Sequence, residues 1–195
     1  QMNTGFNLMK GGPRQAMKNF RAHGLRIYGT FIFGYDHDTP DTFRQTMEFA
    51  QSEGLFIGAF NHITPFPGTP LYQRMKNAGR LLFENWWNDP TYRYNMIPFS
   101  PARMSPQELA DLCVRARREF YGWPSIARRS MHRVNWRDPW MWMNYWMINA
   151  MHQKDVSGRN GLPLGDANWR GQILQSEHAC DVDELLSTPI TAKIG

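Results

Sequence analysis

Cysteine is scarce in this 195-residue chain, which has only Cys113 and Cys180. Two cysteines so far apart build no disulfide framework, and their spacing matches no zinc knuckle. We therefore expect a reducing, cytoplasmic setting. A signal-like start, a dinucleotide fingerprint and a phosphate-binding loop are missing as well. The chain begins at Gln1 without an initiator Met, so we expect a fragment or a processed chain.

Acidic residues are outnumbered, with 17 Asp and Glu against 22 Lys and Arg and a net charge of +5. Eight arginines lie between Arg103 and Arg137, some in the doublets Arg117–Arg118 and Arg128–Arg129. We favour a solvated helix face, with a phosphate, nucleic-acid or anionic-membrane contact as the alternative. No motif indicates nucleic-acid binding in particular. At 42% hydrophobic and 20% charged residues, the composition is that of a folded domain.

The first half of the chain alternates between helical and extended patterns. We predict a helix over 13–24, a buried strand over 25–33, a helix over 40–54, a strand over 56–63 and a helix over 70–78. Strands that alternate with helices of this length predict parallel βαβ units in an α/β fold. Right-handed crossovers then bring the ends of both strands to one rim, so the segments 34–39 and 64–69 share it.

The second half has a different character. An irregular stretch over 85–101, with room for one short strand, precedes a capping box at Ser105-Pro106-Gln107-Glu108. We predict helices over 106–122, 124–133 and 139–152, and then a loosely ordered tail. The predicted divisions are 1–100, 101–153 and 154–195.

Several polar residues allow more than one interpretation. Asp36, His37 and Asp38 could bind a metal or act as acid and base, but we favour a solvated turn with helix-capping aspartates. His62 either points into the rim as a hydrogen-bond donor or is a satisfied core histidine. Cys113 falls on the apolar side of its helix and is expected in the core.

Two further segments are conspicuous. His178-Ala179-Cys180-Asp181, with Asp183, looks like a metal site but lacks a fixed four-ligand spacing, so we reject it. The Trp- and Met-rich helix over 139–152 is too short to span a bilayer. It could rest on a membrane surface, cover a hydrophobic substrate or be buried, and we favour burial.

Two loops carry a family resemblance. Phe31-Ile32-Phe33-Gly34-Tyr35-Asp36-His37-Asp38-Thr39, followed by Thr64-Pro65-Phe66-Pro67-Gly68-Thr69-Pro70-Leu71-Tyr72, resembles the late strands of the radical S-adenosylmethionine (SAM) barrel. Family members commonly end the first strand in a Gly-Leu-Pro-Gly-Glu-Thr-like turn and the second in a Pro-x-Pro-Gly-Thr-x-Leu-Tyr-like loop. Here Tyr35-Asp36-His37 replaces Leu-Pro-Gly. The resemblance covers about residues 5–130, and the segments 78–82 and 104–109 resemble members with an upstream cobalamin-binding domain.

The resemblance implies a fold, cofactors and site residues. The fold is a partial parallel TIM-like barrel of βα units followed by an α-helical extension. The cofactors are SAM and a 4Fe-4S cluster, with cobalamin as a further candidate. Ile32 and Gly34 would lie beside SAM, Asp38 takes the family's common Glu position, and backbone contacts near the adenine would come from Thr64, Pro65, Phe66, Pro67 and Gly68. The family's Cys-x-x-x-Cys-x-x-Cys motif is absent from this chain, so the cluster ligands are expected in an N-terminal part of the same protein.

We therefore expect the C-terminal part of a radical SAM enzyme, which cleaves SAM reductively or transfers a methyl group. Its partners would be the missing N-terminal part, an electron donor protein and a small-molecule or lipid-like substrate, with a membrane surface as a further candidate. The alternative is a non-catalytic α/β module that binds a protein partner or an anionic surface through its arginines and its Trp/Met helix. A third hypothesis is a small hydrolase using Asp36, His37 or His62.

Overall fold

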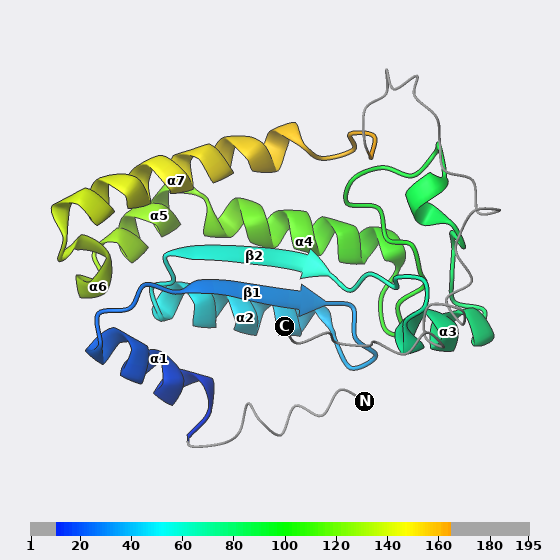
Figure 1. Ribbon diagram of the computed structural model, residues 1–195, viewed down its shortest axis with the longest axis horizontal. Helices are drawn as coiled ribbons and strands as arrows, with labels where there is room; N and C mark the ends of the chain where they lie inside the picture. Colours follow the sequence, from blue (N-terminus) through cyan, green and yellow to red (C-terminus); the bar gives the residue numbers. More distant parts are fainter. Residues whose placement is uncertain (1–10, 165–195) are drawn as a thin grey trace, which may run out of the picture. The chain divides into compact units, whose positions relative to one another are not determined.

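The computed structural model describes residues 11–164 (Figure 1). The elements are α1 Gly12–Ala22, β1 Tyr28–Phe33, α2 Pro40–Ser52, β2 Ile57–His62, α3 Pro70–Asn77, the short 3-10 helix η2 Trp86–Asn88, α4 Pro106–Phe120, α5 Trp123–Ser130, α6 Arg133–Trp136 and α7 Pro139–Gly158. Helices and strands alternate through the first half and helices fill the second, so the predicted α/β arrangement is confirmed.

Three helices begin with the same local device, a short polar residue followed by proline. The side chains of Thr69, Ser105 and Asp138 each accept a hydrogen bond from the backbone N–H three residues later. Proline at the first helical position has no N–H to leave unpaired and is already held near the helical φ. The starts of α3, α4 and α7 were therefore predictable from the sequence alone.

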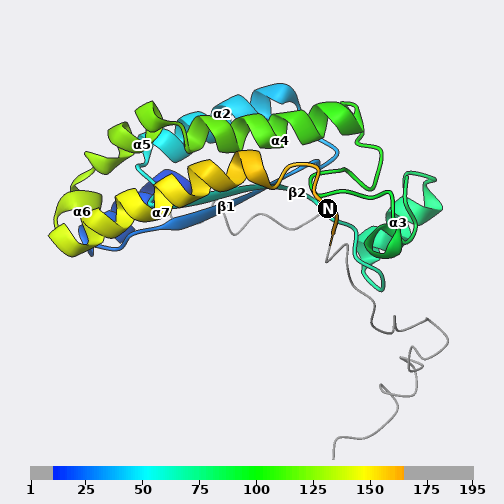
Figure 2. The ribbon, with the colours of Figure 1, turned by 90° about the horizontal axis from the view of Figure 1, so that it is seen from above.

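The sheet consists of β1 and β2, paired in parallel with Phe33 opposite His62. Within residues 11–164 it has these two strands only, so the barrel implied by the resemblance stays a prediction. Figures 1 and 2 show α2 and α4 on one side of the sheet. The crossover through α2 places the carboxyl ends of both strands at the same edge, as expected for a βαβ unit.

The predicted burial of the first strand is wrong for one of its two faces. Phe31 and Phe33 face the helices, where Phe31 stacks on Phe60 at 5.2 Å and Phe33 stacks on Phe43 at 3.8 Å. Tyr28, Thr30 and Ile32 point the other way and are exposed. The strand also begins at Tyr28, three residues later than expected. Its apolar sequence was typical of a strand buried on both faces, but no described element covers the second face.

One hydrophobic core joins the strands to α4. Phe33 and Phe60 of the sheet share it with Leu109, Cys113 and Phe120 of α4. The prediction that Cys113 lies in the core is confirmed, because its side chain is buried there. Since α4 supplies much of this core, the helical second half is packed directly onto the sheet.

Side chains terminate the sheet at the free edge of β2. The Tyr121 hydroxyl donates to the Gly58 carbonyl at 2.8 Å and accepts from the Gly58 N–H at 3.2 Å. Arg117 Nε donates to the Phe60 carbonyl at 2.8 Å, and Asn149 Nδ2 donates to the Phe56 carbonyl at 3.2 Å. These groups take the hydrogen-bonding positions that a further strand would need, so the sheet ends at β2.

The C-terminal helices differ from the prediction in length. α5 ends at Ser130, and the short α6 follows after a break. α7 runs to Gly158, six residues beyond the predicted end, and lies beside α4 (Figure 2). No helix within 11–164 combines the length and the apolarity needed to cross a bilayer. The rest of the predicted tail from 165 on, including His178 to Asp183, lies outside the described residues.

The segment after α7 is tied back onto the chain. A bridge pairs Arg93 with Pro163, Tyr94 N–H donates to the Leu162 carbonyl at 2.8 Å, and Gly161 N–H donates to the Tyr94 carbonyl at 3.2 Å. The irregular stretch 85–101 contributes isolated bridges of this kind and contains no strand. Its order comes from tertiary contacts, which a local sequence pattern does not reveal.

Candidate functional site

The two resemblance loops leave the sheet side by side. Phe33 and His62 are paired in register, and the Ile63 N–H donates to the Phe33 carbonyl at 2.7 Å just past the strand ends. The segment 34–39 follows β1 directly, and the segment 64–69 follows β2. Both loops therefore lie at the carboxyl edge of a parallel sheet, the usual position of ligand sites in such folds.

Asp38 shapes the first loop from within. Its Oδ2 accepts hydrogen bonds from the N–H groups of Gly34 at 2.8 Å and Tyr35 at 3.0 Å. This carboxylate oxygen is occupied by the loop's own backbone, as in an aspartate-closed turn. The residue at the family's common Glu position thus holds the loop in shape.

Asp36 ties the same loop to a distant segment. Its Oδ1 lies 2.7 Å from Arg80 Nη1, and Arg80 Nε donates to the Ser100 carbonyl at 2.8 Å. The hydrogen bond from Arg80 lowers the pKa of the Asp36 carboxyl. His37, between the two aspartates, is exposed. The sequence did not single out Arg80, since nothing local distinguishes it from other surface arginines.

Gly34 is packed by the protein itself. It is buried at φ +98°, and a Cβ built on it would lie 2.9 Å from Leu109 Cδ2 and 3.1 Å from Phe99 Cζ. A side chain would therefore meet α4 and the segment before it. The glycine lets the turn sit against the core.

The second loop is fastened at its start and end and open in its middle. Pro65 is buried, and its carbonyl accepts a hydrogen bond from Trp86 Nε1 at 3.1 Å. The Thr69 hydroxyl donates to the Phe66 carbonyl at 2.6 Å. Between these anchors Phe66, Pro67 and Gly68 are exposed, while Thr64 is half-buried. Of the predicted contact residues in this loop, these three have the freest surface.

The uncovered face of the sheet carries a small group of side chains near the same edge. Ile32 and Asn61 are paired in register and both exposed, with Thr30 and Ala59 one step earlier on the same face. We call this group of four the open sheet face. It offers apolar contact, two small residues and one amide that can donate and accept hydrogen bonds. The alternation of faces along β2 could have revealed Asn61, which the sequence analysis did not single out.

Side chains alternate along a strand, and His62 faces the helix side of the sheet. The interpretation that His62 points into the rim is therefore wrong. Burial and the nearby Arg117 lower the pKa of His62 to about 4 from an ordinary value of 6.5. Its Nδ1 is buried and has no hydrogen-bond partner among the described residues, so it is not a satisfied core histidine either.

Stability should fall on acidification because of His62. The unfolded chain binds a proton on this imidazole between about pH 6.5 and 4, whereas the folded chain does not, so unfolding becomes easier as the pH falls through that window. Urea midpoints measured at pH 7 and pH 5 should differ less for His62→Gln than for the unmodified chain. The exposed His37, replaced in the same way, is the matched control and should leave the difference unchanged.

The residues present do not fit an iron–sulfur cluster. No group of three or more His, Cys, Asp or Glu side chains within residues 11–164 is arranged to hold a metal ion. The Cys113 thiol is buried, and burial raises its pKa to about 12, which disfavours the thiolate that a cluster needs. The open sheet face, by contrast, suits the apolar and amide-binding parts of a nucleoside-like ligand.

Three comparisons with known proteins bear on identity. The bacteriochlorophyllide d C-12(1)-methyltransferase of Chlorobaculum tepidum is 29% identical over 154 residues, which are 78% of this chain and 32% of the relative. The C-8(2)-methyltransferase of the same organism is 26% identical over 60% of this chain and 25% of the relative. The anaerobic magnesium-protoporphyrin IX monomethyl ester cyclase of Cereibacter sphaeroides is 23% identical over 93% of this chain and 27% of the relative.

No protein-family model and no solved structure matches the chain. The chain spans about a third or less of the length of these curated relatives. The relatives and the two loops nevertheless agree on the family that the sequence analysis inferred. The chain is therefore similar to members of the radical SAM superfamily.

Proposed function

We propose that the chain forms part of a radical SAM enzyme that transfers a methyl group to a carbon of a large, largely apolar ring substrate. Two of the relatives are named as methyltransferases of bacteriochlorophyllide d, and the third acts on magnesium-protoporphyrin IX monomethyl ester. A porphyrin- or chlorin-like macrocycle is therefore the substrate class that we propose. The non-catalytic alternative has no support among these relatives, since each is named as an enzyme.

The observation that carries the proposal is the open sheet face beside the two loops. Ile32 and Asn61 sit at the carboxyl ends of β1 and β2, on the face that no described helix covers. In this proposal Ile32 packs on the adenosyl or methionyl part of SAM, and the Asn61 amide donates to one of its polar atoms. Phe66, exposed in the second loop, provides further apolar contact.

SAM, when bound, supplies the methyl group or the radical chemistry, and the residues here bind and orient it. Gly34 and Asp38 hold the first loop in shape, and Trp86 and Thr69 hold the second. The cluster ligands, the electron donor and the N-terminal part of the enzyme lie outside this chain in the proposal. The resemblance to members with an upstream cobalamin-binding domain extends it to cobalamin-dependent transfer.

Replacing Ile32 with arginine should weaken SAM binding by about tenfold or more, because a charged side chain removes the apolar contact and is itself desolvated. Tyr28→Arg is the matched control, on the same face and strand but at the opposite end. Both side chains are accessible, Ile32 being 47% and Tyr28 62% exposed. Equilibrium binding of radiolabelled SAM to the chain measures the effect. Equal losses for both variants would contradict a site at the carboxyl edge.

A further inference from the structure

We infer that the outward face of α7 docks on an anionic lipid surface. The inference does not rest on the proposed methyl transfer, because it concerns a different element and a different surface. One face of α7 packs against the protein, and the opposite face is directed outward.

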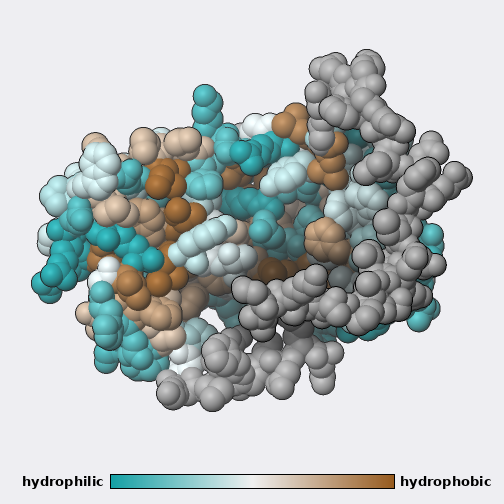
Figure 3. All heavy atoms as spheres, in the orientation of Figure 1, coloured by the Kyte–Doolittle hydropathy of each residue, from teal (hydrophilic) through white to brown (hydrophobic). Residues whose placement is uncertain are grey.

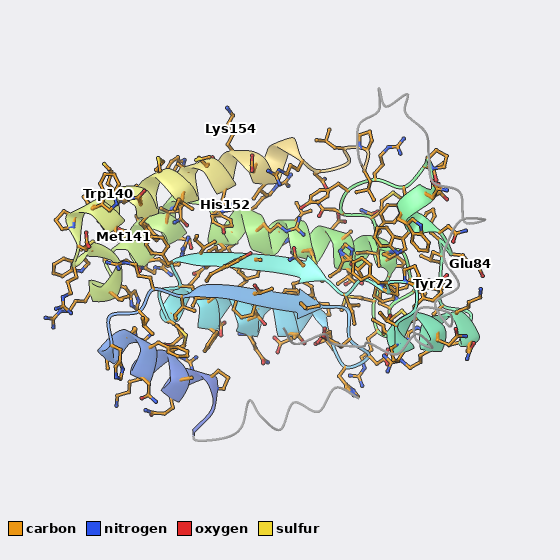
Figure 4. All side chains as sticks on the ribbon, viewed as in Figure 1. Tyr72, Glu84, Trp140, Met141, His152 and Lys154 are labelled. Carbon is orange, nitrogen blue, oxygen red and sulfur yellow. The ribbon has the colours of Figure 1, made fainter. Side chains whose placement is uncertain are left out.

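The inward face of α7 is fully engaged. Tyr145 and Asn149 are buried, Tyr145 donates to the Ile126 carbonyl at 2.8 Å, and the His152 ring stacks on Tyr121 at 4.9 Å. Figure 4 shows His152 pointing toward α4. These residues are spaced by three and four, so they form one stripe along the helix.

The opposite face is apolar and exposed. The exposed side chains on it are spaced by three and four and comprise Trp140, Met143, Met147 and Met151, and Lys154 follows in the same series. We call these four the outer stripe. In Figure 4, Trp140 and Lys154 point away from the rest of the described chain. A helix face directed away from its own protein is normally polar, so the outer stripe calls for a partner.

The charge around the outer stripe is mainly positive. Between residues 122 and 158 the exposed basic residues are Arg128, Arg133, Arg137 and Lys154, and the acidic residues are Asp138 and Asp155, the latter 2.9 Å from Arg159. The Asp138 carboxylate is used at the start of α7, where it accepts the Met141 N–H at 3.1 Å. Figure 3 shows hydrophobic and hydrophilic side chains mixed on the surface at this end of the described chain.

A hollow at the start of α7 adds a second observation. It has a volume of about 450 Å³ and is lined by Arg26 and Arg137 together with Asp138 and Pro139, next to Trp140. Arg26 Nε is buried and has no hydrogen-bond partner among the described residues. Two arginines, one with an unused donor, suit a phosphate or carboxylate headgroup.

Together these features favour a lipid surface over a protein-binding groove. The outer stripe carries Trp and Met side chains and is followed by Lys154, while the exposed Arg128, Arg133 and Arg137 belong to the segment before α7. Apolar side chains close to basic ones favour contact with an anionic membrane surface. The lipid headgroups would meet the basic residues, and the outer stripe would enter the boundary beneath them. The charge excess is what favours lipid over a second copy of the chain, which carries the same positive charge.

The test is cosedimentation of the chain with vesicles. The unmodified chain should bind phosphatidylserine-containing vesicles more tightly than phosphatidylcholine vesicles, and salt should weaken the binding. Met147→Glu should reduce the affinity by about tenfold, the loss expected for a buried methionine. Leu82→Glu is the matched control, because Met147 is 53% and Leu82 51% exposed, and it should leave the affinity unchanged. Met151→Glu repeats the test should Met147→Glu impair folding.

A second pair of variants tests the charge. Arg133→Gln with Arg137→Gln should weaken binding to the phosphatidylserine vesicles alone, whereas Lys18→Gln with Arg103→Gln should not. The inference fails if the unmodified chain does not sediment with vesicles, or if Met147→Glu and Leu82→Glu behave alike. It also fails if the chain is a dimer that Met147→Glu converts to a monomer without any lipid binding.

Discussion

Replacing Arg129 with methionine should destabilise the fold by about 3–5 kcal/mol. Arg129 is fully buried, and none of the ion pairs among the described residues includes it. Its guanidinium donates to the carbonyls of Leu55 and Phe120, each at 2.8 Å, and to Asn149 Oδ1 at 3.1 Å. It also lies 3.6 Å from the centre of the Phe120 ring.

Two effects oppose each other in this substitution. Removing the charge relieves its burial cost, which is large enough to lower the pKa of Arg129 to about 10. Methionine, however, leaves three buried acceptors unpaired, at about 1–3 kcal/mol each, and these losses outweigh the relief. The acceptors come from the segment before β2, the end of α4 and α7, so their loss should loosen α7 from the sheet.

Urea unfolding at pH 7 measures the change, and Arg128→Met is the matched control. Arg128 is the exposed neighbour on the same helix, and its loss should alter the free energy of unfolding by less than about 0.5 kcal/mol. Similar midpoints for the two variants would mean that the buried guanidinium contributes no net stability.

Gly34→Ala should cost roughly 2–4 kcal/mol and displace the first loop. The new Cβ would meet Leu109 Cδ2 at 2.9 Å and Phe99 Cζ at 3.1 Å, and alanine is strained at φ +98°. Displacing the loop moves the Asp38 carboxylate that closes it, so the affinity for SAM should fall together with stability.

Gly68→Ala separates the two causes. Gly68 has φ +76°, but a Cβ added to it would have no other atom within 4 Å, so alanine there meets backbone strain alone, about 1–2 kcal/mol. Urea midpoints for both variants, with radiolabelled SAM binding alongside, give the comparison. A Gly34→Ala chain as stable as the Gly68→Ala chain would show that the core yields to the extra methyl group.

The order of elements in the first half was predictable because local patterns determine it. Proline at the first helical position and a polar cap mark the helix starts, and alternating strands and helices indicate a parallel βαβ unit. The positions of α3, α4 and β2 agree with the prediction to within one or two residues. The ends of α5 and α7 were wrong, since tertiary packing rather than a local stop determines where those helices end.

The candidate site was predictable only in outline. The sequence located the two loops, and strand pairing places them side by side. The sequence did not identify Asn61, Arg80 or Trp86. Arg80 and Trp86 form hydrogen bonds with partners at least 20 residues away, and Asn61 matters because of the face of β2 on which it lies. The predicted SAM contacts at Ile32, Thr64 and Gly68 stay predictions.

In the arginine segment, the tertiary structure differs from what the local sequence pattern predicts. Arg128 and Arg129 are adjacent and alike in sequence, and a solvated face was expected for both. That expectation is wrong for Arg129, which turns inward at the meeting point of three backbone segments, while Arg128 stays in water.

Neighbouring residues and contiguous motifs were enough to predict the βα alternation, the helix caps, the two loops and the resemblance to radical SAM enzymes, because each of these features is local in the chain. Tertiary contacts determine which face of β1 is open and place side chains of α4 and α7 at the edge of β2, where the sheet ends. They also leave Trp140, Met143, Met147 and Met151 of the apolar helix α7 exposed. Burial depends on which elements pack together, and the identity of an apolar residue does not show whether its face of the strand or helix is covered.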